Sequence, residues 1–229
     1  APQGGVLARL AGTRGDIQAI VTGEGSWSEW NGALLVRQDG ARLAALKLGN
    51  RGGNYSALGQ LAPDGYAAGL VGNALGKVVA LSLEGTLADN VLDSKVALAG
   101  RALRVNGGGR IDLGHSRFDA FGIKARTTDP DLLGPEVRLE ELRLTAELDG
   151  PFGELRARHL LELDRLVSGD MAIDRLAQRG TLTWGEDGLR LPLGVSVRRI
   201  TSGVDMVDPR LVNGTLEGLL RFDGDRLQA

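Results

Sequence analysis

The chain of 229 residues contains no cysteine and few aromatic residues. The absence of cysteine excludes disulfides, thiolate nucleophiles and cysteine-ligated metals. Phe, Trp and Tyr make up only 4% of the chain, although 42% of its residues are hydrophobic, so the apolar content is aliphatic. The formal net charge is −2, whereas proteins that bind nucleic acid usually carry a basic surface. No apolar run approaches the roughly 20 residues of a transmembrane helix, so we expect neither a nucleic-acid partner nor a membrane-spanning helix in this piece.

The strongest pattern present is strict alternation of apolar and polar residues. It runs through Lys77–Leu87, Phe121–Arg126, Leu155–Asp164 and Leu189–Arg198. Side chains on a β-strand point alternately to the two faces of a sheet, so each segment has one apolar and one polar side. The sequence therefore predicts an all-β protein made of amphipathic antiparallel strands.

Turn residues support this interpretation, and several strands are expected to be long and bent. Asp39-Gly40 has the composition of a two-residue hairpin turn, and we expect further turns at Gly107–Gly109 and at Asp149-Gly150-Pro151. The alternation changes phase at Gly100 and at Glu140-Glu141, which predicts a bulge or bend inside a strand. A short helix is expected at Tyr66–Leu75 and a loop at Thr128–Gly134. We expect residues 1–229 to form one segment of a longer chain.

Candidate catalytic and metal-binding motifs do not hold together. On a strand, His159 and Glu162 point to opposite faces, and His115 lies beside a turn. The stretch from Gly69 to Val78 departs from the phosphate-binding loop pattern at two positions. Trp27 and Trp30 favour a plug at the end of the sheet over a carbohydrate platform. We therefore predict a protein that is not an enzyme and has no metal or cofactor.

The apolar faces of these strands need something to cover them. A sandwich core usually relies on aromatic side chains for packing, and this chain has few. We expect instead a long curled sheet, an open β-taco groove, with a hydrophobic concave face that suits acyl chains. The residues predicted to line it are Val79, Leu81, Leu83, Val96, Leu98, Ile111, Leu113, Phe121, Ile123, Leu142, Leu144, Leu148, Leu161, Leu163, Leu189, Leu191, Leu193, Val195 and Val197.

A family resemblance points the same way. It is carried by the segments Gly25–Gly32, Leu43–Leu48 and Arg51–Tyr55, with Gly59–Pro63, Val137–Leu139, Leu148–Phe152, Leu191–Leu193 and Ile200-Thr201 further along. Together they resemble an internal stretch of a TamB-type translocation and assembly module protein of the AsmA-like superfamily. The resemblance implies a periplasmic hydrophobic groove that conducts phospholipids between the inner and outer membranes and supports outer-membrane biogenesis. It also implies that the parent chain is anchored in the inner membrane and contacts a TamA-like outer-membrane protein.

Two other functions compete with the lipid conduit. A chaperone-like scaffold would offer its sheet edge or groove to nascent outer-membrane strands. A structural β-solenoid or adhesin segment would instead have a filled interior. For the conduit, we expect a charge at Leu81, Leu161 or Leu193 to block passage more than one at Glu84 or Arg158.

Overall fold

The computed structural model describes residues 17–63, 69–185, 188–223 and 226–228. The chain divides into two compact units, unit 1 up to Leu103 and unit 2 from Arg104 onward. This boundary falls at the start of strand β7 (Leu103–Asp112) rather than in a linker.

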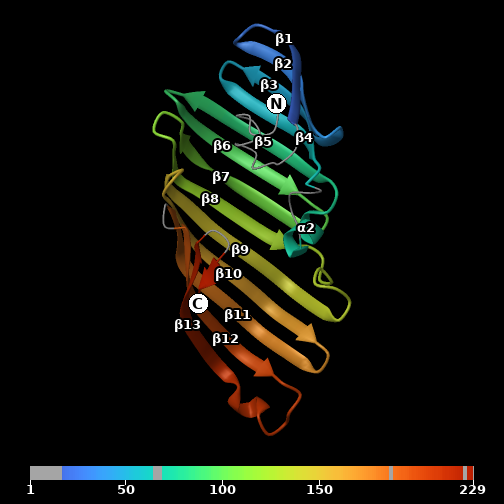
Figure 1. Cartoon of the computed structure of the whole chain (residues 1–229), viewed down its shortest axis with the longest axis vertical. Coiled ribbons are helices and arrows are strands. Elements are labelled where there is room, and N and C mark those ends of the chain that lie inside the picture. Colours follow the sequence, from blue (N-terminus) through green and yellow to red (C-terminus); the bar gives the residue numbers. More distant parts are fainter. Residues whose placement is uncertain (1–16, 64–68, 186–187, 224–225, 229) are drawn as a thin grey trace. The chain divides into compact units, whose positions relative to one another are not determined.

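Unit 1 is an antiparallel sheet with one short helix at its side. Its strands are β1 (Ile17–Gly25), β2 (Glu29–Gln38), β3 (Ala41–Arg51), β4 (Asn54–Leu61), β5 (Val79–Ala88) and β6 (Val91–Ala99), and neighbours pair in chain order. Helix α2 (Gly69–Leu75) connects β4 to β5 (Figure 1). It is the lone α-helix of the described residues and falls within the stretch where the sequence predicts one; residues 66–68 of that stretch lie outside the described part.

Unit 2 continues with longer strands. They are β7, β8 (Arg117–Thr127), β9 (Val137–Pro151), β10 (Leu155–Ser168), β11 (Met171–Gly185), β12 (Gly188–Thr201), β13 (Val212–Asp223) and β14 (Arg226–Gln228). From β8 to β14, neighbours again pair antiparallel in chain order. A 3-10 turn, η1 (Asp208–Arg210), lies between β12 and β13.

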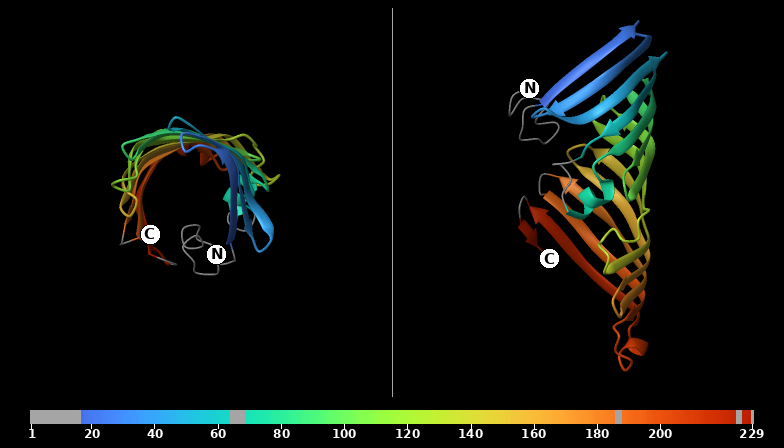
Figure 2. Two further views of the ribbon diagram at one scale, coloured as in Figure 1. Left: turned by 90° about the horizontal axis from the view of Figure 1, so that it is seen from above. Right: turned by 90° about the vertical axis from the view of Figure 1, so that its right-hand side faces the viewer.

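The sheet is open, as the sequence predicts. Among the described residues β1 pairs only with β2, and β14 pairs only with β13. Within each unit the strands are twisted and bowed rather than flat (Figure 2). The all-β, antiparallel, long-stranded class is therefore confirmed, and β9 to β12 have 14 or 15 residues each.

Hairpin turns follow the expected chemistry in the N-terminal unit. Asp39 and Gly40 have φ values of 48° and 83°, the left-handed conformations that a type I′ turn requires. Asp89-Asn90, between β5 and β6, has φ values of 50° and 61° and makes a similar turn. The sequence analysis missed this turn because neither of its residues is glycine.

Three predicted breaks are placed differently. Gly107–Gly109 lies inside β7 rather than in a turn. A glycine is needed at position 109 because a Cβ there would come within 2.8 Å of the Phe121 Cα atom on β8. Asp149-Gly150-Pro151 forms the end of β9, and the chain turns at 152–154 instead. Gly100 lies between β6 and β7 and so separates two strands rather than bending one. The predicted loop at Thr128–Gly134 is confirmed.

A candidate acyl-chain surface

The strand register of unit 1 brings its predicted lining residues onto one face. Leu81 lies opposite Leu98, and Leu83 lies opposite Val96. Residues paired across an antiparallel ladder point to the same side of the sheet. Following the pairs from β1 to β6 gives a continuous set, here called the aliphatic face of unit 1: Val21, Leu34, Val36, Leu46, Leu48, Ala57, Leu61, Val79, Leu81, Leu83, Leu87, Leu92, Val96 and Leu98.

The opposite face of the same strands, the polar face of unit 1, is charged. Glu84 lies opposite Lys95 on β6 and opposite Ser56 on β4. Lys47 on β3 lies opposite Leu58, an exposed leucine on this face. Unit 1 is therefore amphipathic across its one sheet layer.

Unit 2 repeats this arrangement on β8 to β13. Its register aligns Phe121, Leu148 and Ala157, and likewise Leu144 and Leu161. The aliphatic face of unit 2 comprises Phe121, Ile123, Ala125, Leu142, Leu144, Ala146, Leu148, Ala157, Leu161, Leu163, Leu176, Leu182, Leu189, Leu191, Leu193, Val195, Val197, Leu216, Leu220 and Phe222. The sequence analysis missed its β11 members because Gln178 and Gly180 interrupt the alternation there.

One predicted lining residue, Leu113, lies outside the strands. Leu113 follows the end of β7, in the turn before β8, and its side chain is 48% exposed. Its neighbour Ile111 lies on β7 and is half-buried. The apolar alternation of β7 thus continues in the sequence to Leu113, one residue past the point where the strand ends.

Burial within each unit follows the aliphatic face. Val79 is 2% exposed in unit 1, and Phe121, Ala157 and Leu163 are 7%, 7% and 6% exposed in unit 2. Within each unit, the described residues supply no second sheet to cover this face. Buried residues also lie outside the strands, at Ala74 on α2 in unit 1 and at Leu132 in the loop before β9 in unit 2.

One polar pair lies within the aliphatic face of unit 2. The His159 Nε2 atom is 2.9 Å from the Gln178 Oε1 atom, and the Gln178 amide donates to the Pro192 carbonyl oxygen at 3.2 Å. Ladder pairing between β11 and β12 is interrupted between Arg179 and Thr183, opposite Pro192, which has no N–H to donate. Gln178 is 9% exposed, so these hydrogen bonds satisfy a buried side chain.

The tryptophans do not plug the sheet as the sequence suggests. Trp27 is 97% exposed in the turn between β1 and β2. Trp30 instead lies over the backbone of its own hairpin, because a Cβ at Gly23 or at Gly32 would meet its ring. The two glycines thereby leave room for the ring on the aliphatic face.

Hollows lie on the polar faces. In unit 2 a hollow of about 1060 Å³ lies across β7 to β11, lined by Lys124, Glu147, Arg158, Glu162 and Arg179. In unit 1 a hollow of about 710 Å³ is lined by residues that include Lys47, Glu84 and Lys95. Small residues on these faces leave such space, whereas leucine and valine fill the aliphatic faces.

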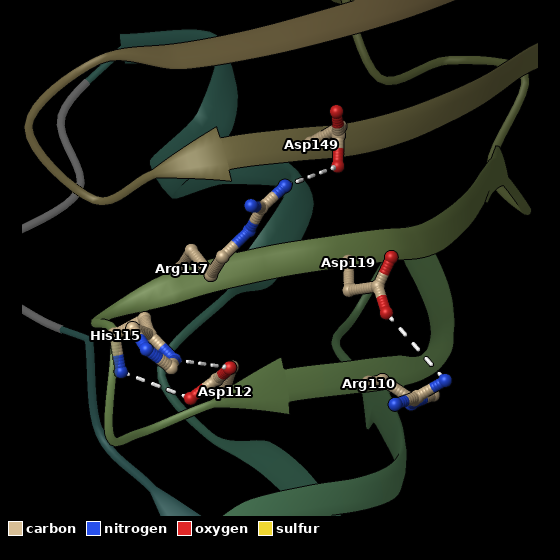
Figure 3. Close-up of polar contacts among 6 residues, drawn as sticks. All are labelled: Arg110, Asp112, His115, Arg117, Asp119 and Asp149. Atoms are coloured by element: carbon tan, nitrogen blue, oxygen red, sulfur yellow. Dashed lines mark hydrogen bonds and ion pairs between the residues drawn. The ribbon is translucent and has the colours of Figure 1, made fainter.

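The polar face of unit 2 carries short-range ion pairs between adjacent strands (Figure 3). Arg110 on β7 pairs with Asp119 on β8 at 3.6 Å, and Arg117 pairs with Asp149 on β9 at 3.6 Å. All four side chains are substantially exposed, and exposed ion pairs typically contribute under about 1 kcal/mol. These pairs therefore belong to a solvated surface.

Two carboxyl groups in turns have lowered pKa values. Asp112 accepts hydrogen bonds from the His115 ring and from its backbone N–H, which lower the pKa of Asp112 (Figure 3). The pKa of Asp208 is lowered because the hydroxyl and the backbone N–H of Ser202 both donate to it at 2.7 Å. His115 is a turn residue with an 81% exposed side chain. In the part of the chain that the structure describes, no group of three or more His, Asp or Glu residues is placed to hold a metal ion.

Comparison with known proteins adds no relative. No protein-family model, curated protein or solved structure matches this chain. No helix among the described residues is long and apolar enough to span a membrane.

Proposed function

We propose that this chain is a segment of a TamB-type hydrophobic conduit for phospholipids, in which the aliphatic faces contact acyl chains. The observation that carries the proposal is the aliphatic face of each unit, which runs from β1 to β6 in unit 1 and from β8 to β13 in unit 2. Full removal of an acyl methylene from water is favourable by about 0.8 kcal/mol, and contact with an open sheet face supplies part of this free energy. These contacts are not directional, so they suit chains that slide and differ in length.

The polar groups on the aliphatic faces are consistent with this role. In unit 2, the Gln178 side-chain N–H donates a hydrogen bond to the Pro192 carbonyl oxygen, and the Gln178 Oε1 atom is hydrogen-bonded to the His159 ring. A surface whose few polar groups are satisfied internally does not favour one headgroup over another. The proposed segment therefore binds the acyl portion of phospholipids.

The proposal places the chain in the periplasm as part of a longer protein anchored in the inner membrane. A TamA-like outer-membrane protein would then contact the parent chain. These statements rest on the resemblance to TamB-type proteins.

Native mass spectrometry of the purified chain tests the proposal with a matched pair of variants. Leu161 and Leu160 are adjacent, half-buried leucines on β10 that point to the aliphatic and the polar face, respectively. We expect wild type and Leu160→Lys to retain co-purified phospholipid. We expect Leu161→Lys to carry at least tenfold less phospholipid than wild type. A lipid-free wild-type protein that also rejects added phospholipid would contradict the proposal.

The chaperone-like alternative rests on a different observation. Strand β1 has one unpaired edge among the described residues, and unpaired strand edges accept further strands. Crosslinking of unfolded barrel segments to β1, without any lipid crosslinks to either aliphatic face, would favour that function instead.

A further inference from the structure

A row of irregular positions crosses five strands of unit 2. The paired ladders skip Glu141 and Asp164 between β9 and β10, Arg175 and Arg198 between β11 and β12, and Asn213 on β13. Glu141, Arg175 and Asn213 have φ values of 53°, 51° and 53°, on alternate strands. Left-handed backbone at residues other than glycine is energetically costly, and such strain often occurs at functional sites.

The row places consecutive side chains on the same face. A hollow of about 730 Å³ on the polar face is lined by both Asp174 and Arg175, and by both Arg198 and Arg199. In a regular strand, consecutive side chains point to opposite faces. The irregular positions therefore add Asp164, Arg175 and Arg198 to the four other charged residues that line this hollow.

The aliphatic face continues across the row for the same reason. On β9 to β12 the aliphatic residues on the two sides of the row are three positions apart, which would put them on opposite faces of a regular strand. They are Leu139 and Leu142, Leu163 and Leu166, Ile173 and Leu176, and Val197 and Ile200. The sequence analysis detected this phase slip on β9 alone, at Glu140-Glu141.

Carboxylates around the hollow already have arginine partners. Arg143 pairs with both Glu141 and Asp164, with an Nη2 to Oδ1 distance of 2.7 Å to the latter. Arg165 pairs with Asp174 across the β10–β11 ladder at 3.4 Å. The remaining carboxylate, Glu140, pairs with Arg138 at 3.8 Å.

Three arginines at the hollow have no such partner. Arg175, Arg198 and Arg199 line it, and none of them has a side-chain hydrogen bond or ion pair among the described residues. Arg175 and Arg198 occupy opposing positions on adjacent strands, where like charges repel. An anion bound between them would relieve this repulsion.

We propose that Arg175, Arg198 and Arg199 form a binding site for a phosphate group on the polar face of unit 2. Guanidinium groups donate paired N–H bonds that match the geometry of phosphate oxygens. Four arginines and three carboxylates line the hollow, so its lining carries one excess positive charge, whereas the chain as a whole has a net charge of −2. The site lies on the opposite face of the sheet from the acyl-chain surface and does not rest on the proposed conduit.

Calorimetric titration with inorganic phosphate, at an ionic strength held constant with sodium chloride, tests the site. The key variant is Arg175→Asn with Arg198→Gln and Arg199→Gln, because asparagine tolerates the left-handed backbone at position 175. The control is Arg179→Gln, an exposed arginine on the polar face of the same strand. We expect saturable binding by wild type, at least tenfold weaker binding by the triple variant and less than a twofold change in the control.

The single variants Arg198→Gln and Arg199→Gln keep the test valid if the triple variant does not fold. Each is expected to weaken binding threefold or more. Wild-type protein that shows no saturable binding up to about 10 mM phosphate overturns the proposal. Equal affinity in wild type and the arginine variants overturns it as well.

Vesicles identify the source of the phosphate group. Co-sedimentation with vesicles of phosphatidylcholine and phosphatidic acid, abolished by inorganic phosphate and by the triple variant, would assign the site to a lipid headgroup. Phosphate binding without vesicle binding would assign it to a soluble phosphate compound, and both results support the site. Vesicle binding that the triple variant retains would overturn its role in lipid recognition.

Discussion

Replacing Leu163 with alanine tests which face of unit 2 stabilises the fold. Leu163 is 6% exposed on β10 and lies opposite Leu142 on β9 and Leu176 on β11. Truncation of a buried leucine to alanine costs about 2–5 kcal/mol. Because no second sheet layer among the described residues of unit 2 lies over Leu163, its neighbours can close part of the space. We therefore expect a loss of about 2–3 kcal/mol.

The matched control is Leu219→Ala on the polar face. Leu219 on β13 lies opposite Pro192 on β12 and is 37% exposed. Its truncation should therefore change the free energy of unfolding by no more than about 0.5 kcal/mol. Urea unfolding followed by circular dichroism measures both variants. With a slope of about 2 kcal/mol per molar urea, Leu163→Ala should lower the midpoint by about 1–1.5 M. Equal midpoint shifts for the two variants would refute the assignment of faces.

Two further predictions concern polar contacts. Gln178→Leu removes the hydrogen-bond partner of the His159 Nε2 atom and of the Pro192 carbonyl, and should cost about 1 kcal/mol in urea unfolding. Adding His159→Leu should recover part of that loss, and a purely additive double variant would contradict the pairing. Asp112 has a pKa below its ordinary value of 3.8, so its contribution to stability is present above that pH and is lost as the pH falls through the lowered pKa. The stability difference between wild type and Asp112→Asn should therefore shrink from neutral to acid pH, and a constant difference in pH-dependent unfolding would count against the His115 contacts.

The fold class could be read from the sequence because it follows from local chemistry. Alternation at Val79, Leu81 and Leu83 reflects the two-residue period of a strand, and the Asp39-Gly40 turn reflects the backbone freedom of its residues. Neither property depends on distant contacts. The long antiparallel strands and the single short helix were therefore predictable.

Positions that depend on neighbouring strands were harder to predict. Gly109 has the composition of a turn but lies within β7, because the close approach of the β8 backbone, not a chain reversal, requires a glycine there. The phase slip at Glu141 is visible in one strand, but its alignment with Arg175 and Asn213 appears only when the register is known. The arginine site was missed because its residues are adjacent in the sheet and not in the sequence.

Site-specific photo-crosslinking tests the central claim most directly. A photo-reactive residue at Leu161 samples the aliphatic face of unit 2, and one at the adjacent Leu160 samples the polar face. In cells, we expect phospholipid adducts at position 161 and at least tenfold fewer at position 160. Equal labelling at the two positions, or none at position 161, would contradict a lipid-contacting role for the aliphatic face.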